Sequence, residues 1–348
     1  MTPLSSPKSS VLLIYTGGTI GMRADSPDGA LRPFDFSGVL QEVPELSKYA
    51  MKIDSLTFDP LIDSSDVEPS TWLDIAKAIR DNYDAYDGFV VLHGTDTMSY
   101  SASVLSFMLE GLGKPVIFTG SQLPVGAPRT DGRENLVSSV EIASAKLPDG
   151  SAAVSEVCIF FDSKLLRGNR TTKISAERFD AFHSPNIPPL AEAGISIQYN
   201  NALIRRPSSD ERFSISTSLD TRVSILKIHP GITPQVVRNI LLGPETRAVI
   251  METYGSGNAP TAPWFMSIVK EAVAMGKIIV NVTQCGSGRV DMSRYATGKT
   301  LLEAGVLSGY DSTTESALAK LFYLMGRYEN DERVKELFTQ DLRGEISK

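Results

Sequence analysis

Residues 11–22 read VLLIYTGGTIGM, an apolar run that stops abruptly at Thr-Gly-Gly-Thr. The first five residues have the length and composition of a short buried strand. Two later stretches repeat this design, because GFVVLHGTDT (88–97) and KPVIFTGS (114–121) are also apolar runs that end in small polar residues. Helical patterns follow at 98–109 and 131–147. Strands that alternate with helices predict an α/β fold.

The length of the chain predicts two domains, since 348 residues exceed one ordinary core. The alternation is interrupted by a polar, serine-rich stretch, IRRPSSDERFSISTSLDT (204–221), and resumes with RVSILKIH. We expect a larger N-terminal, mostly parallel α/β domain over 1–204, a linker over 205–221 and a smaller C-terminal α/β domain over 222–348. Within the first domain, SSDVEPSTWLDIAKAIRDNYD predicts a helix with Ser70 as its N-cap.

Charge and hydropathy exclude several classes of partner. The formal net charge is −7 and the sequence pI is about 5.2, whereas nucleic-acid binding needs clustered Lys and Arg. No segment reaches the roughly 20 apolar residues that span a bilayer. The apolar run near the N-terminus is shorter than the core of a signal peptide, and the two cysteines, Cys158 and Cys285, lie far apart. We expect a cytoplasmic protein that binds neither nucleic acid nor membrane.

The polar turns after the strands predict where a site lies. In an open parallel sheet, ligands bind beyond the carboxyl ends of the strands, where the strand order reverses. If the three strands are parallel, their turns share one edge of the sheet. Thr19, Thr95, Asp96 and Ser121 then lie in one crevice.

Several site chemistries match the sequence poorly. The turn Thr-Gly-Gly-Thr-Ile-Gly has the wrong spacing for the dinucleotide fingerprint, and no phosphate-binding G-x-x-x-x-G-K-[ST] occurs. The three histidines lack metal-ligand spacing, and no G-x-S-x-G elbow is present. His93 ends an apolar strand, so we expect a packed, hydrogen-bonded ring. We therefore expect neither a metal nor a cofactor.

A threonine nucleophile is the remaining chemistry. A hydroxyl needs a neighbouring base, and lysine can serve when desolvation or a partner lowers its pKa. Lys173, in RGNRTTK, is the candidate base and Asp96 the candidate orienting group. The alternative interpretation treats Lys173 as a solvated lysine, the glycine-rich turns as tight connections, and Asp96 or Thr97 as a helix cap.

Six segments resemble one known family. YTGGTIGM, DGFVVLHGTDTMSYSASVLSFML, GKPVIFTGSQLP, RGNRTTK, YGSGNAP and VNVTQCGSG together resemble the bacterial L-asparaginases, particularly the cytoplasmic type I group. The matches run in order through nearly the whole chain. This resemblance implies deamidation of L-asparagine to L-aspartate and ammonia, without a cofactor, by a homodimer or homotetramer. Direct displacement and an acyl-enzyme both remain open as the route.

The resemblance also assigns roles to individual residues. Thr19 matches the nucleophile, and Thr95, Asp96 and Lys173 match a second set that moves the proton. The segment LIDSSD matches the part that holds the α-carboxylate of the substrate. The resemblance and the expected crevice together give a set of substrate-binding residues. These are Asp63, Ser64, Ser65, Thr95, Asp96, Ser121 and Asn258, the last lent by a neighbouring subunit.

The chain departs from the family pattern in three places. A tyrosine on the loop after TGGT is replaced around Ala30 and Leu31, which leaves Phe34, Phe36 or Tyr49 as candidates to close the site. At the second, regulatory asparagine site of type I enzymes, Thr172 and Cys285 are compatible, but Glu252 stands where an arginine is expected. A carboxylate cannot pair with the carboxylate of a ligand, so we expect weak or absent allostery. The acidic residue lent across the family's subunit interface has no secure counterpart near GRVDMSRY.

Two alternative functions remain at this stage. One is an amidohydrolase that accepts glutamine or feeds ammonia to a transfer-RNA amidating complex, although such relatives carry an additional N-terminal domain. The other is a catalytically silent amino-acid sensor on the same scaffold. A sensor does not need a nucleophile, so replacement of Thr19 by alanine separates the two classes.

Overall fold

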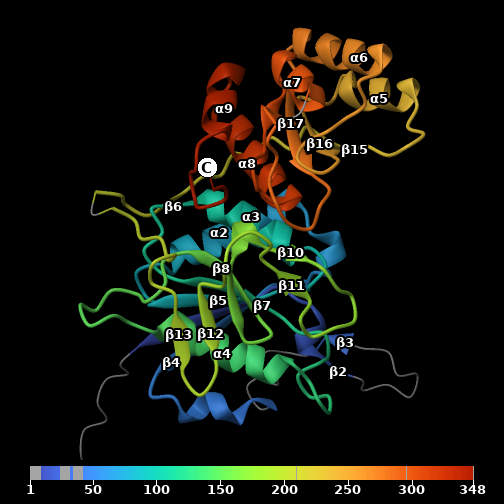
Figure 1. Cartoon of the computed structure of the whole chain (residues 1–348). Helices are drawn as coiled ribbons and strands as arrows, with labels where there is room; N and C mark the ends of the chain where they lie inside the picture. Colours follow the sequence, from blue (N-terminus) through green and yellow to red (C-terminus); the bar gives the residue numbers. More distant parts are fainter. Residues whose placement is uncertain (1–8, 24–31, 34–41, 209, 295, 348) are drawn as a thin grey trace, which may run out of the picture. The chain divides into compact units, whose positions relative to one another are not determined.

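The computed structural model describes residues 9–23, 32–33, 42–208, 210–294 and 296–347. Ala30 and Leu31, which stand in the place of the family's loop tyrosine, and Phe34 and Phe36, two of the candidates to close the site, lie outside the described residues. The chain divides into two units (Figure 1). The first runs to Ser184 and includes Pro188–Ile215, and the second comprises Pro185–Ile187 and the chain from Ser216 onward.

The first unit is built on an eight-stranded sheet of order β13-β12-β9-β8-β7-β5-β1-β4. Strands β4, β1, β5, β7 and β8 are parallel, and β9, β12 and β13 extend the sheet in antiparallel pairs. The sheet is therefore mostly parallel, as the alternation predicts. Its strands are β1 Ser10–Tyr15, β4 Lys52–Thr57, β5 Gly88–Leu92, β7 Val116–Thr119, β8 Val157–Phe161, β9 Lys164–Arg167, β12 Ala191–Ala193 and β13 Ile197–Tyr199.

The strand order reverses between β1 and β5. From β1 the chain adds β4 on one side, and it then crosses to add β5 on the other side, followed by β7 and β8. The turns that begin at Thr16 and His93 leave the carboxyl ends of these two strands. They therefore flank the switch point at which open α/β sheets bind ligands.

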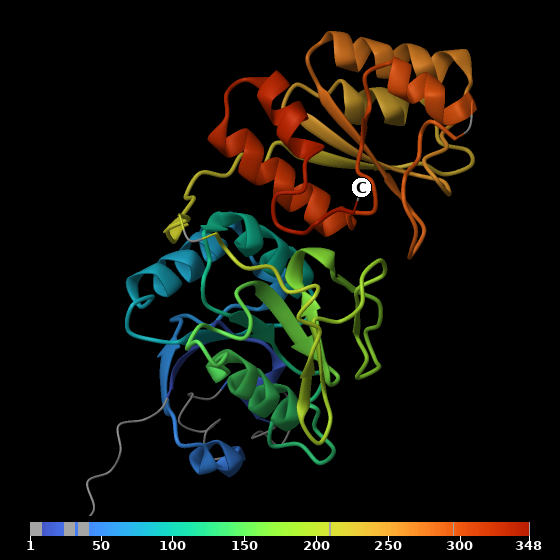
Figure 2. The ribbon, with the colours of Figure 1, turned by 60° about the vertical axis from the view of Figure 1, so that its left-hand side comes forward.

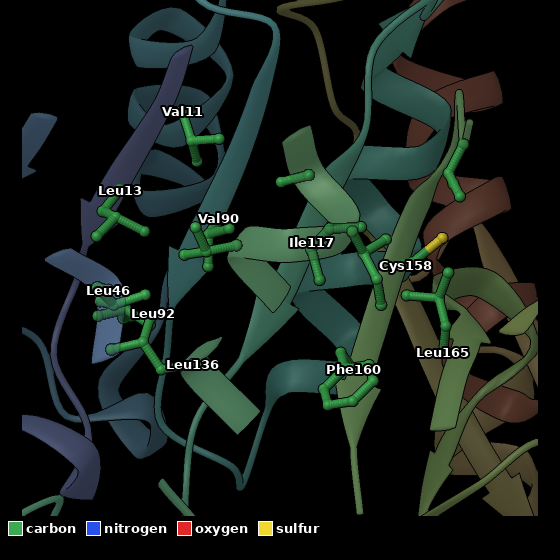
Figure 3. Close-up of a cluster of buried hydrophobic side chains, with 14 of the residues drawn as sticks. Val11, Leu13, Leu46, Val90, Leu92, Ile117, Leu136, Cys158, Phe160 and Leu165 are labelled. Carbon is green, nitrogen blue, oxygen red and sulfur yellow. The ribbon is translucent and has the colours of Figure 1, made fainter. Parts of the chain in front are cut away.

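Helices cover both faces of this sheet. Helix α4 (Gly132–Ser144) packs against β1, β5, β7 and β8, and α3 (Met98–Met108) packs against β7 and β8 and against α2 (Pro69–Asp81). Figure 2 shows α4 on one face and α2 with α3 on the other. Alternate strand residues meet the α4 face, among them Val11, Val90, Ile117 and Cys158 (Figure 3). Burial of both faces explains why these strands read as continuous apolar runs.

Helix α2 corrects one expectation. Ser70 is not its N-cap, because the helix begins at Pro69 with Glu68 in the cap position. Proline has no N–H and its φ is already helical, so it favours the first helical position. The backbone N–H of Glu68 donates to the hydroxyl of Thr71 at 3.4 Å.

The second unit has a four-stranded parallel sheet of order β15-β16-β17-β18. Helices α5 and α6 pack on each other over one apolar cluster, and α8 packs against β15 and β16. These elements are β15 Val223–Lys227, β16 Ala248–Thr253, β17 Ile278–Thr283, β18 Leu307–Ser308, α5 Pro234–Leu241, α6 Pro263–Ala274, α7 Ala296–Glu303, α8 Thr314–Arg327 and α9 Asp331–Phe338.

Short elements complete the chain. Within the segment 205–221, expected as a linker, β14 pairs with β6 of the first unit. Among the described helices, none combines the length and the hydropathy needed to cross a membrane. The short elements are β2 Met22–Arg23, β3 Arg32–Pro33, β6 Leu109–Glu110, β10 Thr172–Lys173, β11 Phe182–His183, β14 Ser214–Ile215 and the 3₁₀ helices η1 Thr19–Gly21, η2 Pro44–Lys48, η3 Ser64–Asp66 and η4 Gly168–Arg170.

Candidate active site

Glycines bring the turns after β1 and β5 into backbone contact. A Cβ atom added to Gly18 would lie 2.6 Å from the Cα of Gly94, and one added to Gly94 would lie 2.4 Å from the Oγ of Ser64. Gly18 also has a φ of 91°, which side chains disfavour. The Thr-Gly-Gly-Thr and Gly-Thr-Asp-Thr turns and the 3₁₀ turn at Ser64 therefore form one packed layer.

Ser64 binds the second turn through both its side chain and its backbone. The N–H of Asp96 donates to the Oγ of Ser64 at 3.3 Å, and the hydroxyl of Thr97 donates to the Ser64 carbonyl at 2.7 Å. Thr97 occupies the N-cap position of α3 but makes no side-chain capping bond. Its hydroxyl instead fixes the turn that carries Thr95 and Asp96.

Lys173 joins two residues of that turn. Its ammonium donates to the hydroxyl of Thr95 at 2.8 Å and to Oδ1 of Asp96 at 2.7 Å. The Lys173 side chain is 18% exposed and the Asp96 side chain 65% exposed. The amine of Lys173, the hydroxyl of Thr95 and the carboxylate of Asp96 therefore lie together beside the switch point, and the carboxylate is exposed to solvent.

Thr19 begins the 3₁₀ turn η1, directly after the packed Gly18. It is half-buried. The hydroxyl of Tyr15 stabilises this turn by donating to the Gly21 carbonyl at 3.1 Å. Burial raises the pKa of Tyr15 to about 12, so the hydroxyl keeps its proton at neutral pH. Thr19 therefore sits on a fixed backbone whose neighbour, Gly18, touches the turn that carries Thr95.

Asp63, Ser65 and Ser121 form local contacts. Asp63 caps η3 by accepting hydrogen bonds from the N–H and the hydroxyl of Ser65, both at 2.9 Å, and these bonds lower the Asp63 pKa. Both residues are exposed beside the buried Ser64. The hydroxyl of Ser121, after β7, donates to the Leu123 carbonyl at 2.5 Å. Among the described residues, hydrogen bonds thus join Ser64, rather than Ser121, to the Thr95–Asp96 turn.

His93 is a packed histidine, as expected, and its partners could not be read from the sequence. Its Nδ1 lies 2.6 Å from the Gly94 carbonyl and its Nε2 lies 3.0 Å from the hydroxyl of Ser101, which accepts from Trp72 Nε1 at 2.9 Å. Burial lowers the His93 pKa to about 4. Trp72 and Ser101 sit on different helices, so no local spacing signals this chain of contacts.

The remaining candidates lie elsewhere. Thr172 is half-buried in β10, beside Lys173. Asn258, Glu252 and Cys285 belong to the second unit. Asn258 accepts from the Thr297 hydroxyl at 2.5 Å.

Glu252 and Cys285 differ in their surroundings. One carboxylate oxygen of Glu252 accepts from Thr314 at 2.7 Å, and the other lies 3.3 Å from Lys227 Nζ. Cys285 is exposed and free.

The cluster in the first unit has the groups for acyl transfer. A hydroxyl on a fixed turn can attack a carbonyl, and a lysine beside a second hydroxyl can move protons. Backbone N–H groups of the two turns can stabilise a developing oxyanion. Within the described ranges, no cluster of three or more His, Cys, Asp or Glu side chains could hold a metal ion.

Comparison with known proteins gives a consistent result. The family model "Asparaginase, N-terminal" matches residues 10–205, and "Glutaminase/Asparaginase C-terminal domain" matches residues 222–338. The chain is 45% identical to L-asparaginase 1 of Escherichia coli K12, with 98% of each chain covered. It is 42% identical to a 60 kDa lysophospholipase of Mus musculus, covering 64% of that protein.

The fold leads to the same family. The crystal structure of L-asparaginase I from Vibrio cholerae superposes with a TM-score of 0.88 at 43% identity, covering 97% of this chain and 99% of that one. The two family models together account for both sheets described above. The chain therefore belongs to the asparaginase family.

Proposed function

We propose that this enzyme hydrolyses the side-chain amide of L-asparagine to L-aspartate and ammonia, with Thr19 as the nucleophile. The observation that carries the proposal is the placement of the Lys173 ammonium against both Thr95 and Asp96, on a turn that packs against the turn of Thr19. The names of the E. coli and Vibrio relatives support the choice of substrate.

The proposed chemistry begins at the hydroxyl of Thr19. Its oxygen attacks the amide carbon, and its proton reaches the leaving nitrogen through the Thr95–Lys173 pair, so that ammonia departs. Water then cleaves the threonyl ester by the reverse proton path, which restores Thr19 and yields aspartate. Backbone N–H groups of the two turns hold the oxyanion, and each such donor typically contributes about 100- to 1,000-fold in rate.

The zwitterionic end of asparagine needs charge partners. Asp96 is the proposed partner of the α-ammonium, and its exposure leaves the carboxylate accessible. Ser64, flanked by Asp63 and Ser65, is the proposed contact for the α-carboxylate, and Ser121 lines the same edge. Asn258, on the second unit, is the proposed contribution of a neighbouring subunit. An active homodimer or homotetramer follows from that contribution.

The proposal requires neither metal nor cofactor, because hydroxyl, ammonium and carboxylate groups supply every proton transfer. A cytoplasmic location is proposed as well. It is supported by the two free cysteines, of which Cys285 is exposed and fits a reducing compartment.

Weak or absent activation by asparagine is proposed from Glu252. This carboxylate already accepts from Thr314 and pairs with Lys227. It would repel the carboxylate of a second asparagine molecule rather than bind it. Thr172 and Cys285 are the other residues proposed around that regulatory site.

Steady-state ammonia release tests these proposals together. Purified protein is assayed over a range of L-asparagine and, separately, L-glutamine concentrations, with and without a metal chelator. We expect the rate of ammonia release from asparagine to saturate hyperbolically and to be the same with and without the chelator. Turnover of glutamine alone would overturn the substrate assignment, and a Hill coefficient clearly above one would overturn the argument from Glu252.

A further inference from the structure

The ring of His93 bridges the core of the first unit and the turn that carries Thr95. His93 follows β5 directly and is 1% exposed. Its ring packs edge-on against Phe118, with 5.7 Å between ring centroids. One ring nitrogen faces the Gly94 carbonyl at 2.6 Å, and the other faces the hydroxyl of Ser101 at 3.0 Å.

The partners of the ring determine where its proton lies. The Gly94 carbonyl only accepts, so Nδ1 must carry the hydrogen of that bond. The indole N–H of Trp72 only donates, and the Ser101 oxygen accepts it at 2.9 Å. The Ser101 hydroxyl hydrogen is then available for Nε2, which accepts it. A neutral ring protonated at Nδ1 therefore gives each group in this series of hydrogen bonds, from Trp72 through Ser101 and His93 to Gly94, a matching donor or acceptor.

The bond to Gly94 constrains the next residue. A peptide group is planar and trans, so a carbonyl held toward His93 directs the N–H of Thr95 the opposite way. Glycine offers little resistance to rotation of this peptide. Within the described part of the chain, the Thr95 N–H meets no acceptor. Its direction therefore depends on what holds the Gly94 carbonyl.

The other contacts around the Gly94 peptide act on its neighbours rather than on its carbonyl, since Ser64 holds the turn beyond Thr95 through Asp96 and Thr97. Gly18, Ser64 and Gly120 approach residues 93–94 closely enough to exclude a Cβ, but these are packing contacts. The His93 N–H donates to the Thr119 carbonyl at 2.9 Å, which fixes the backbone before the ring rather than after it. Among the described residues, the imidazole Nδ1–H is the only hydrogen-bond donor to the Gly94 carbonyl.

We propose that His93 is a positioning residue for amide hydrolysis, because its Nδ1–H holds the Gly94 carbonyl and so aims the Thr95 N–H and hydroxyl at the reacting amide. The inference rests on the proposed function of the Thr19–Thr95–Lys173 site. No hydrogen bond joins His93 to Lys173 within the described residues, and in this proposal His93 acts through the backbone of Gly94.

Two amide substitutions separate this role from simple packing. In His93→Asn the side-chain NH₂ occupies the place of Nδ1 and can still donate to Gly94, whereas in His93→Gln the amide occupies the place of Nε2 and reaches Ser101 instead. We expect kcat of His93→Asn to stay within about tenfold of wild type and kcat of His93→Gln to fall on the order of 100-fold. KM should change by less than about threefold in both, because the lost interaction acts in the transition state.

Nitrogen NMR of the histidine rings gives a second readout that does not depend on activity. We expect His93 to be protonated at Nδ1 and bare at Nε2 in the wild-type protein. Protonation at Nε2 would overturn the inference. Equal kcat values for the two variants would also overturn it, and so would losses of kcat that run parallel to the losses of unfolding free energy. An inactive wild type with the Nδ1–H ring would instead refute the proposed function and leave the hydrogen bond established.

Discussion

The Nζ of Lys173 lies 2.8 Å from the hydroxyl oxygen of Thr95, across 78 positions of sequence. Thr95 follows a core strand, whereas Lys173 stands on β10, in a two-stranded sheet with β11. Asp96 shares the ammonium at 2.7 Å. A lysine that is mostly covered and bonded to both residues has the placement that the proposed proton transfer requires.

Lys173→Met tests that assignment. The variant removes the amine while keeping most of the side-chain volume, so we expect kcat to fall by about 100-fold or more. The free energy of unfolding should change by less than about 1 kcal/mol, because Asp96 is largely exposed. Lys164→Met, which breaks an exposed pair with Asp162, is the matched control. Equal activity of the two variants would refute the role of Lys173.

Gly94→Ala tests the contact between the turns. The added Cβ would lie 2.4 Å from Ser64 Oγ. We expect a loss of about 1–3 kcal/mol in unfolding free energy, together with a loss of turnover. Gly194→Ala is the control, because its Cβ would find its nearest atom 3.9 Å away. If Gly94→Ala unfolds at the same denaturant concentration as Gly194→Ala, the close packing of Gly94 against Ser64 is contradicted.

Much of the fold could be predicted from residue patterns. The runs that became β1, β5 and β7 are apolar on both faces, as buried parallel strands must be. The antiparallel strands β12 and β13 are only three residues each and partly exposed, so their pattern is too weak to read. Ser70 has the side chain of an N-cap, but the helix begins one residue earlier, because proline favours the first helical position.

The site was less accessible from the sequence. The polar turns indicate an edge of the sheet, but closeness of Gly18 and Gly94 depends on strand order, which no local pattern encodes. The bond between Thr97 and Ser64 and the chain from His93 to Trp72 join separate elements. Such contacts arise from packing. Residue chemistry alone makes Lys173 a candidate base, and the resemblance to a known family is what favours that role over a solvated lysine.

His93 predicts a pH dependence of stability. Its pKa falls from the ordinary 6.5 to about 4 in the folded chain, because the charged ring would be buried. Between pH 6.5 and pH 4, the imidazole of His93 binds a proton in the unfolded chain but stays neutral in the folded chain. The stabilisation is therefore complete above pH 6.5 and is lost as the pH falls toward 4, with a full extent on the order of 3 kcal/mol.

Denaturant unfolding of wild type and His93→Asn between pH 4 and pH 8 measures this effect. The difference between their unfolding free energies should shift in favour of His93→Asn as the pH falls. His183→Asn, which removes an exposed imidazole, is the control. A difference that stays constant with pH would contradict a buried neutral ring.

Lys320 and Glu345 predict a stability effect in the second unit. Both side chains are 1% exposed and form an ion pair, and Glu345 also accepts from the N–H of Leu342 at 3.1 Å. Lys320→Met leaves a buried carboxylate without its counter-ion, so we expect a loss of about 3–5 kcal/mol in unfolding free energy. Lys335→Met should cost less than about 1 kcal/mol, since its partner Glu332 is 81% exposed. Equal losses would show that the buried pair contributes nothing.

Thr19→Ala tests the central claim most directly. Ammonia release from L-asparagine is measured for wild type, Thr19→Ala and Thr19→Ser, and asparagine binding to each protein is measured by calorimetry. We expect Thr19→Ala to bind asparagine but to lose at least about 1,000-fold in kcat, while Thr19→Ser keeps part of the activity. Wild-type turnover that survives in Thr19→Ala would contradict a threonine nucleophile at this position, and binding without turnover in the wild type would identify a sensor instead.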